Sequence, residues 1–164
     1  MSERQRDGGI DVIPLPEDVP GELRLCGKRA IGGGRFAHPS MPWTTVVCLC
    51  QRHELANRYP AYVDWLDDPG SNSIWWPIHD LGAAPVDATL PFVDGLAKRL
   101  RAGERLLVHC AAGIGRAGTT AVCILVRLGV PVDDALRTVR ESRTMAGPEA
   151  GAQLALVEAI AAAP

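Results

Sequence analysis

Residues 108–120 read VHCAAGIGRAGTT, a loop that follows an apolar strand pattern and opens a helical pattern. Cys110 and Arg116 bound this loop, and none of the five residues between them carries a polar side chain. These five are Ala111, Ala112, Gly113, Ile114 and Gly115. The N–H groups at the start of a helix have no intrahelical partner, and the helix dipole is positive there. The loop therefore predicts a strand–loop–helix unit whose backbone N–H groups surround a phosphate dianion.

The two residues at the ends of this loop carry its reactive and charged groups. The field that attracts a phosphate also favours a thiolate over a thiol, so we expect the pKa of Cys110 to be lowered. Arg116 has a planar guanidinium that can bind two phosphate oxygens at once. The alternative is that Cys110 is a small buried hydrophobic residue and that the glycines only form a tight turn. The combination of cysteine, glycine-rich loop and arginine before a helix favours a phosphate site with a nucleophile at its base.

The length and composition predict one globular domain. The chain has 164 residues, of which 47% are hydrophobic and 22% charged, which is enough for one well-formed core. The net charge of −2 provides no broad positive field, so we expect neither nucleic-acid nor membrane partners. The N-terminus is polar and does not resemble a signal peptide, so we expect a cytoplasmic protein, with its oligomeric state left open.

The five cysteines do not suggest a disulfide framework, because their number is odd and no secretory signal accompanies them. Cys48 and Cys50 form a CxC pair without a second cysteine pair or a nearby histidine pair, so we predict no metal site and no organic cofactor. One of these two cysteines could form a protective disulfide with Cys110. The interpretation that we favour is that both are core residues.

The pattern of apolar residues predicts alternating strands and helices. Residues 1–21 are rich in proline, glycine and charge, so we expect a flexible N-terminal arm followed by a single domain over residues 22–164. We expect strands within residues 22–31, 44–49, 73–78 and 105–109, and helices within residues 52–57, 61–66, 88–101, 117–128, 132–143 and 150–162. This order predicts an α/β fold, with a central, mostly parallel sheet of about 4–5 strands flanked by helices and a C-terminal helical cluster.

The segment HCAAGIGRAGT resembles the HCxxGxxR[ST]G signature of cysteine-dependent protein tyrosine phosphatases, and it is most similar to the small dual-specificity members. The resemblance covers roughly residues 22–160. It implies that residues 111–115 and Arg116 bind phosphate, while Cys110 attacks phosphorus to form a cysteinyl-phosphate. It also implies a phosphorylated protein as substrate, with phosphotyrosine favoured over phosphoserine and phosphothreonine. Phosphoinositides are disfavoured because the loop contains no lysine.

This mechanism requires an aspartate on a separate loop, which first protonates the leaving oxygen and then activates water. The segment IWWPIHD, residues 74–80, is similar to the family's P-I-x-D segment and supplies Asp80. Asp80 begins a loop with Gly82 and Pro85 that could close over a substrate. Asp87 is the alternative acid, and a turn or helix cap is the alternative role for Asp80.

The resemblance also implies supporting residues. It implies that His109 hydrogen-bonds the loop backbone and helps to set the thiolate. It implies that Gln153 helps to place the hydrolytic water, with a surface glutamine on a helix as the alternative. Arg52 and Glu54 either brace the site or are surface charges at a helix start.

One position departs from the family pattern. The family usually has serine or threonine directly after the arginine, and its hydroxyl donates to the departing thiolate, whereas this chain has Ala117. The loss of one such donor typically costs about 2–4 kcal/mol. We therefore expect the cysteinyl-phosphate to form readily and to break down slowly. The alternative is a pseudophosphatase that binds phosphate with little turnover.

Overall fold

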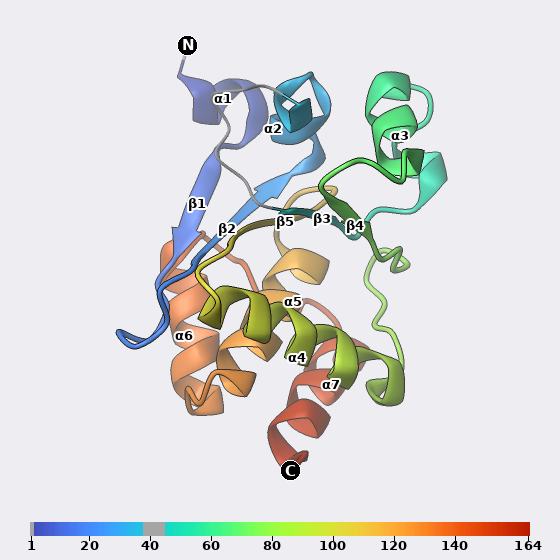
Figure 1. Cartoon of the computed structure of the whole chain (residues 1–164). Helices are drawn as coiled ribbons and strands as arrows, with labels where there is room; N and C mark the ends of the chain where they lie inside the picture. Colours follow the sequence, from blue (N-terminus) through green and yellow to red (C-terminus); the bar gives the residue numbers. More distant parts are fainter. Residues whose placement is uncertain (1, 38–44) are drawn as a thin grey trace.

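A five-stranded sheet forms the centre of the molecule, a computed structural model that describes residues 2–37 and 45–164 (Figure 1). The strand order is β1-β2-β5-β3-β4. Strands β2, β5, β3 and β4 run parallel to one another, and β1 pairs antiparallel with β2. The strands are β1 (Ile10–Ile13), β2 (Glu22–Gly27), β3 (Thr45–Cys48), β4 (Ser73–Trp75) and β5 (Arg105–Cys110). The predicted α/β fold with a mostly parallel sheet is confirmed.

Helices cover both faces of this sheet. On one face lie α4 (Val86–Arg101), α5 (Gly115–Arg127), α6 (Val132–Ser142) and α7 (Gly151–Ala162), gathered together in Figure 1. The other face packs against α2 (Lys28–Gly32) and α3 (Pro60–Asp67). The remaining short elements are α1 (Glu3–Asp7) and the 3₁₀ turns η1 (Arg35–Ala37) and η2 (Arg52–Glu54). Among the described residues, no helix is long and apolar enough to cross a membrane.

The two faces have separate cores because successive side chains of a strand point to opposite sides. On β5, Leu106, Val108 and Cys110 pack into the core beneath α4–α7. Leu107 packs into the second core, beneath α2 and α3. Cys48 belongs to this second core, on the face opposite Cys110, so the strand alternation separates these two cysteines.

The expectation that residues 1–21 form a loosely attached arm is wrong for part of that segment. Residues Ile10–Ile13 form the edge strand β1, whose register pairs Ile10 with Cys26 and Ile13 with Leu23. Ile13 is fully buried in the core, and Val19 is buried as well. The strand has only four residues between glycine-rich and proline-rich segments, so its sequence pattern is too short to be distinguished from a loop.

Other boundaries shift by a few residues. The helix expected within residues 52–57 is reduced to the 3₁₀ turn η2, and the strand expected within residues 73–78 ends at Trp75. The remaining helices lie within a few residues of their expected positions. Residue 44, the first of the predicted strand 44–49, lies outside the described residues.

We expect Ile13→Ala to lower the free energy of unfolding by about 2–5 kcal/mol, because it removes buried methyl groups from a strand that completes the sheet. Its neighbour Val12 is 48% exposed, so Val12→Ala should change stability by no more than about 0.5 kcal/mol. Urea denaturation of both variants measures the difference. Equal and small effects would show that β1 is not part of the folded domain.

Candidate functional site

The loop between β5 and α5 is held against the end of β2. Gly113 adopts a φ of +76°, and a Cβ built there would lie 2.4 Å from the carbonyl oxygen of Cys26, so only glycine fits. The N–H of Lys28 donates to the carbonyl oxygen of Ala111 at 3.0 Å. Close backbone contacts with the end of β2 therefore shape the loop, residues 110–116, and a side chain at position 113 would prevent them.

Cys110 lies at the base of this loop with only 3% of its surface exposed. The N–H of Ala117 donates to its Sγ at 3.5 Å. Burial raises the pKa of the Cys110 thiol, while the Ala117 N–H, the Arg116 guanidinium and the Gly113 N–H act to lower it. The net direction is upward, opposite to the direction expected from the loop alone, because the sequence does not reveal how deeply the sulfur is buried.

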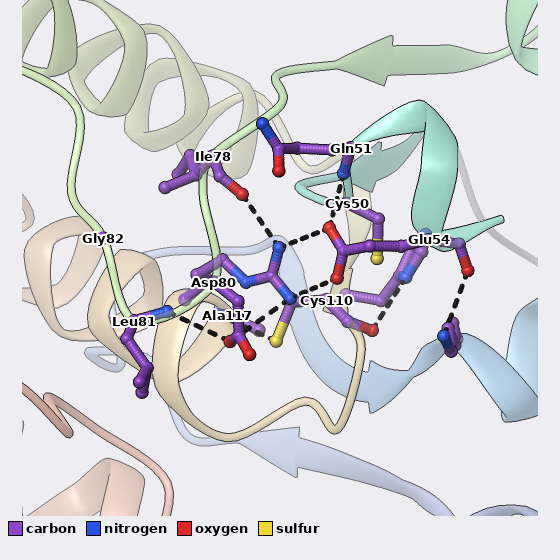
Figure 2. A network of polar contacts seen from close by, with 12 residues as sticks. Cys50, Gln51, Glu54, Ile78, Asp80, Leu81, Gly82, Cys110 and Ala117 are labelled. Carbon is purple, nitrogen blue, oxygen red and sulfur yellow. Dashed lines mark hydrogen bonds and ion pairs between the residues drawn. The ribbon is translucent and has the colours of Figure 1, made fainter.

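Arg116, in the first turn of α5, is surrounded by oxygen atoms from two segments, η2 and the loop after β4. Figure 2 labels the residues that supply them, Glu54, Ile78 and Asp80. Its guanidinium donates to the two carboxylate oxygens of Glu54 at 2.8 and 2.7 Å. It also donates to the carbonyl oxygen of Ile78 at 2.8 Å and lies 3.5 Å from a carboxylate oxygen of Asp80. Its Nε is buried and has no hydrogen-bond partner among the described residues. An unpaired buried donor beside Cys110 matches the requirement of a phosphate oxygen.

Glu54 is the side chain that holds this guanidinium, while Arg52 lies elsewhere. Burial tends to raise the pKa of Glu54, but the hydrogen bonds from Arg116 and from the Gln51 N–H outweigh it and hold the pKa below its usual range. Arg52 instead pairs with Asp67 at 2.7 Å. Of the two residues that the sequence left open, the structure therefore brings only Glu54 to the loop.

Asp80 lies on the loop that follows β4. Its side chain is 71% exposed, and its carboxylate accepts a hydrogen bond from the N–H of Leu81 at 3.0 Å. Leu81 has a φ of 61°, a conformation that non-glycine residues rarely adopt and that clusters at functional loops. The alternative acid Asp87 lies in the first turn of α4 instead. The segment around Asp80 is tied to the Arg116 guanidinium through Ile78, so loop and arginine are positioned together.

His109 and Gln153 are both fully buried. The Nδ1 of His109 lies 3.3 Å from the carbonyl oxygen of Cys110, and its Nε2 lies 2.5 Å from the hydroxyl of Tyr62. The side-chain oxygen of Gln153 accepts from the N–H of Glu149 at 2.7 Å, and its amide nitrogen donates to the carbonyl oxygen of Gly82 at 3.3 Å. Gln153 therefore links α7 to the Asp80 loop and is not a surface residue.

Arg143, at the end of α6, is a residue that the sequence analysis did not single out. It is 7% exposed, and it donates to the carbonyl oxygens of Gly113 at 2.9 Å and Ala112 at 2.8 Å. The same guanidinium pairs with Asp11 of β1 at 2.8 Å. No local pattern could have identified it, because its partners lie about 30 and 132 residues away along the chain. Arg143 fixes the outer side of the loop and connects it to the N-terminal strand.

Comparison with known proteins identifies the family of this arrangement. Residues 35–159 match the family described as "PTP-SAK: Swiss Army Knife protein, DSP-PTPase phosphatase domain". Cyclin-dependent kinase inhibitor 3 of Rattus norvegicus is 31% identical over 103 residues, which are 59% of this chain and 49% of that protein. Protein tyrosine phosphatase type IVA 3 of Homo sapiens is 33% identical over 105 residues, which are 61% of this chain and 55% of that protein. The chain spans about half the length of these curated relatives.

Solved structures share the fold. A crystal structure of kinase associated phosphatase, with its catalytic-site cysteine replaced by serine, superposes with a TM-score of 0.75 at 19% identity, covering 95% of this chain and 97% of that chain. The active form of Tk-PTP superposes with a TM-score of 0.68 at 23% identity, covering 92% of this chain and 95% of that chain. These similarities extend over nearly the whole chain.

We expect Arg143→Ala to lower the free energy of unfolding by about 1–3 kcal/mol, because it frees two loop carbonyls and leaves Asp11 with only Arg4 as its ion-pair partner among the described residues. The affinity for inorganic phosphate should fall as well, because the loop loses its outer support. Arg140 is exposed on the same helix, and Arg140→Ala should change stability by no more than about 0.5 kcal/mol. Urea denaturation and phosphate titration measure both effects, and similar results for the two variants would contradict the assigned role.

Proposed function

Because this chain belongs to the DSP-PTPase phosphatase family, we propose that it hydrolyses phosphate monoesters on phosphoproteins, with phosphotyrosine favoured, through a cysteinyl-phosphate intermediate. The observation that carries the proposal is the convergence of three groups. Cys110 and Arg116 bound one loop, and Asp80 lies within 3.5 Å of the same guanidinium. A nucleophile, an anion-binding group and an acid are the parts that this chemistry requires.

In the first step the Cys110 thiolate attacks phosphorus, and the bond from phosphorus to the leaving oxygen breaks. Asp80, in its protonated form, donates its proton to that oxygen. The loop N–H groups and the Nε of Arg116 bind the remaining phosphate oxygens, and the positive character of these donors also acts in favour of the thiolate. Glu54 and the Ile78 carbonyl hold the guanidinium in place throughout.

In the second step water attacks the phosphorus of the cysteinyl-phosphate, and the S–P bond breaks. Asp80, now a carboxylate, takes the proton from that water, and Cys110 leaves as a thiolate. In this chain the donor to the departing sulfur is the backbone N–H of Ala117, at 3.5 Å. The hydroxyl of Thr119, two residues further along, donates to Gln153 instead. We infer that release of the thiolate limits the overall rate.

The proposal that the substrate is a phosphoprotein rests on the side chains of the loop. Residues 111–115 contribute no positive charge, as expected for a site that recognises one phosphate group on a protein and not several on an inositol ring. The relative named as a cyclin-dependent kinase inhibitor, and the one named as a protein tyrosine phosphatase, support a protein as the substrate. The five cysteines are all free, which supports a reducing compartment, the cytoplasm, as the site of action.

A second candidate function follows from Ala117 alone. Without a side-chain donor to the departing sulfur, the domain could trap phosphate or a phosphorylated partner with little turnover. This pseudophosphatase differs from a slow enzyme only in its second step. The two candidates are therefore separated by kinetics and not by phosphate binding.

The proposed roles predict that the protein hydrolyses p-nitrophenyl phosphate and that Cys110→Ser abolishes this activity, because the variant lacks the thiolate that attacks phosphorus. Asp80→Asn should lower kcat by about 10²–10⁴-fold, since an amide can neither donate the proton in the first step nor take one from water in the second. Asp87→Asn is the matched control and should leave kcat unchanged. Activity that survives in Cys110→Ser would contradict the mechanism, and a loss in Asp87→Asn without a loss in Asp80→Asn would reassign the acid.

Slow breakdown of the intermediate predicts a burst of p-nitrophenolate, equal to about one product per enzyme, followed by slower steady-state turnover. Ala117→Ser restores a hydroxyl next to the sulfur and should raise the steady-state rate by up to about 100-fold. Ala121→Ser, on the same buried helix, controls for the added hydroxyl and should give no gain. Stopped-flow absorbance measures both phases. Single-phase progress curves with no gain in Ala117→Ser would contradict slow breakdown of the intermediate. A burst without turnover would favour the pseudophosphatase.

A further inference from the structure

A second cluster of reactive side chains lies on the face of the sheet opposite Cys110. Cys48 is the last residue of β3, and Cys50 follows it by two residues, so the strand alternation directs both toward one face. The register of β3 and β5 places Cys48 directly beside His109. Two cysteines from one segment therefore meet a histidine from the neighbouring strand, an arrangement that the sequence spacing alone does not reveal.

The donor atoms of these three residues are close enough to share one ion. One sulfur from each cysteine and one ring nitrogen of His109 all lie within 4.8 Å of one another. All three residues are fully buried. Two cysteines and one histidine form a ligand set typical of zinc. Zinc sites in which these three are the only protein ligands are known, with a water or substrate in the fourth position. The hydroxyl of Tyr62, at His109 Nε2, is a neighbouring oxygen donor.

The hydrogen bonds of His109 orient it as a ligand. The carbonyl oxygen of Cys110 can only accept, so its contact with Nδ1 assigns the ring proton to that nitrogen. Nε2 then carries the lone pair, which accepts from the hydroxyl of Tyr62, and a metal ion bound at Nε2 would displace that hydroxyl. Histidine ligands of metals usually donate their other N–H to a carbonyl or carboxylate, which fixes the ring in this way.

The charge balance suits a buried divalent cation. Cysteine binds a metal ion as its thiolate, so an ion at this site displaces one proton from each thiol. One Zn²⁺ that displaces two thiol protons leaves a cluster with no net charge, which a dry interior tolerates better than an isolated ion. Binding must then release two protons, and the affinity must increase with pH.

We propose that Cys48, Cys50 and His109 form a Zn²⁺ site behind the phosphate loop. The evidence for a metal site does not depend on the proposed hydrolysis, because none of the three residues acts on the phosphate. It is nevertheless linked to the loop, since the Nδ1–H of His109 bonds the carbonyl of Cys110. A metal ion that fixes the His109 ring therefore fixes the backbone of the proposed nucleophile.

Titration of the Cys110→Ser protein with Co²⁺ tests the site, because this variant lacks the one thiol that would bind metal in the phosphate loop. We expect a thiolate-to-cobalt charge-transfer band that saturates at one equivalent and disappears when Zn²⁺ is added. Titration with Zn²⁺ in weak buffer should release two protons per ion. Cys110→Ser leaves the three proposed ligands unchanged, so absence of the band in this folded variant would overturn the proposal.

Further substitution in the Cys110→Ser background assigns the ligands. Cys48→Ser and Cys50→Ser should each abolish or strongly weaken the band, while Cys123→Ser should leave it unchanged because that buried cysteine lies in the other core. Circular dichroism and thermal denaturation confirm that each variant is folded. A band that persists in both folded Cys48→Ser and Cys50→Ser would show that the metal binds elsewhere.

Discussion

The buried ion pair between Arg116 and Glu54 is the interaction on which the site depends. The side chain of Arg116 is only 1% exposed, and a guanidinium in such a place requires oxygen atoms on most of its donors. It obtains them from Glu54, Ile78 and Asp80, which lie on segments that follow two different strands. Because the strands are parallel, their carboxyl ends meet at one edge of the sheet, where the loop after β5 also begins. One buried charge thus draws together the three segments that the proposed chemistry uses.

Hydrogen bonds on the outer side of the phosphate loop hold these segments in place. Arg143 binds two loop carbonyls and the N-terminal strand, and Gln153 connects α7 to the Asp80 loop. A carbonyl that is bonded on the outside leaves the N–H groups on the other side of the loop to face a phosphate. The upward shift in the pKa of Cys110 follows from the same enclosure, because burial disfavours the thiolate until an opposing charge or hydrogen bond compensates.

The sheet also separates the proposed nucleophile from the proposed metal site, although Cys110 and His109 are consecutive residues of one strand. Cys110 points toward the core beneath α4–α7, whereas His109, Cys48 and Cys50 gather on the other side. Adjacent residues of one strand therefore serve different faces, so the proposed nucleophile and the proposed metal site share a backbone without sharing a cavity. The hydrogen bond between His109 and the carbonyl of Cys110 is the route by which one influences the other.

The sequence by itself determined the fold class, the strand–loop–helix unit and the identity of Cys110, Arg116 and Asp80 as candidates. Periodicity and spacing predicted the fold class and the strand–loop–helix unit with Cys110 and Arg116, whose residues are close along the chain. Asp80 was identified by the resemblance of residues 74–80 to the family's P-I-x-D segment. The tertiary structure decided which of Arg52 and Glu54 reaches the loop, that Gln153 is buried, that Arg143 supports the loop, and that β1 completes the sheet. It also brought His109 to Cys48 and Cys50. Each of these depends on strand order and register, which place residues far apart in sequence side by side and which no local pattern encodes.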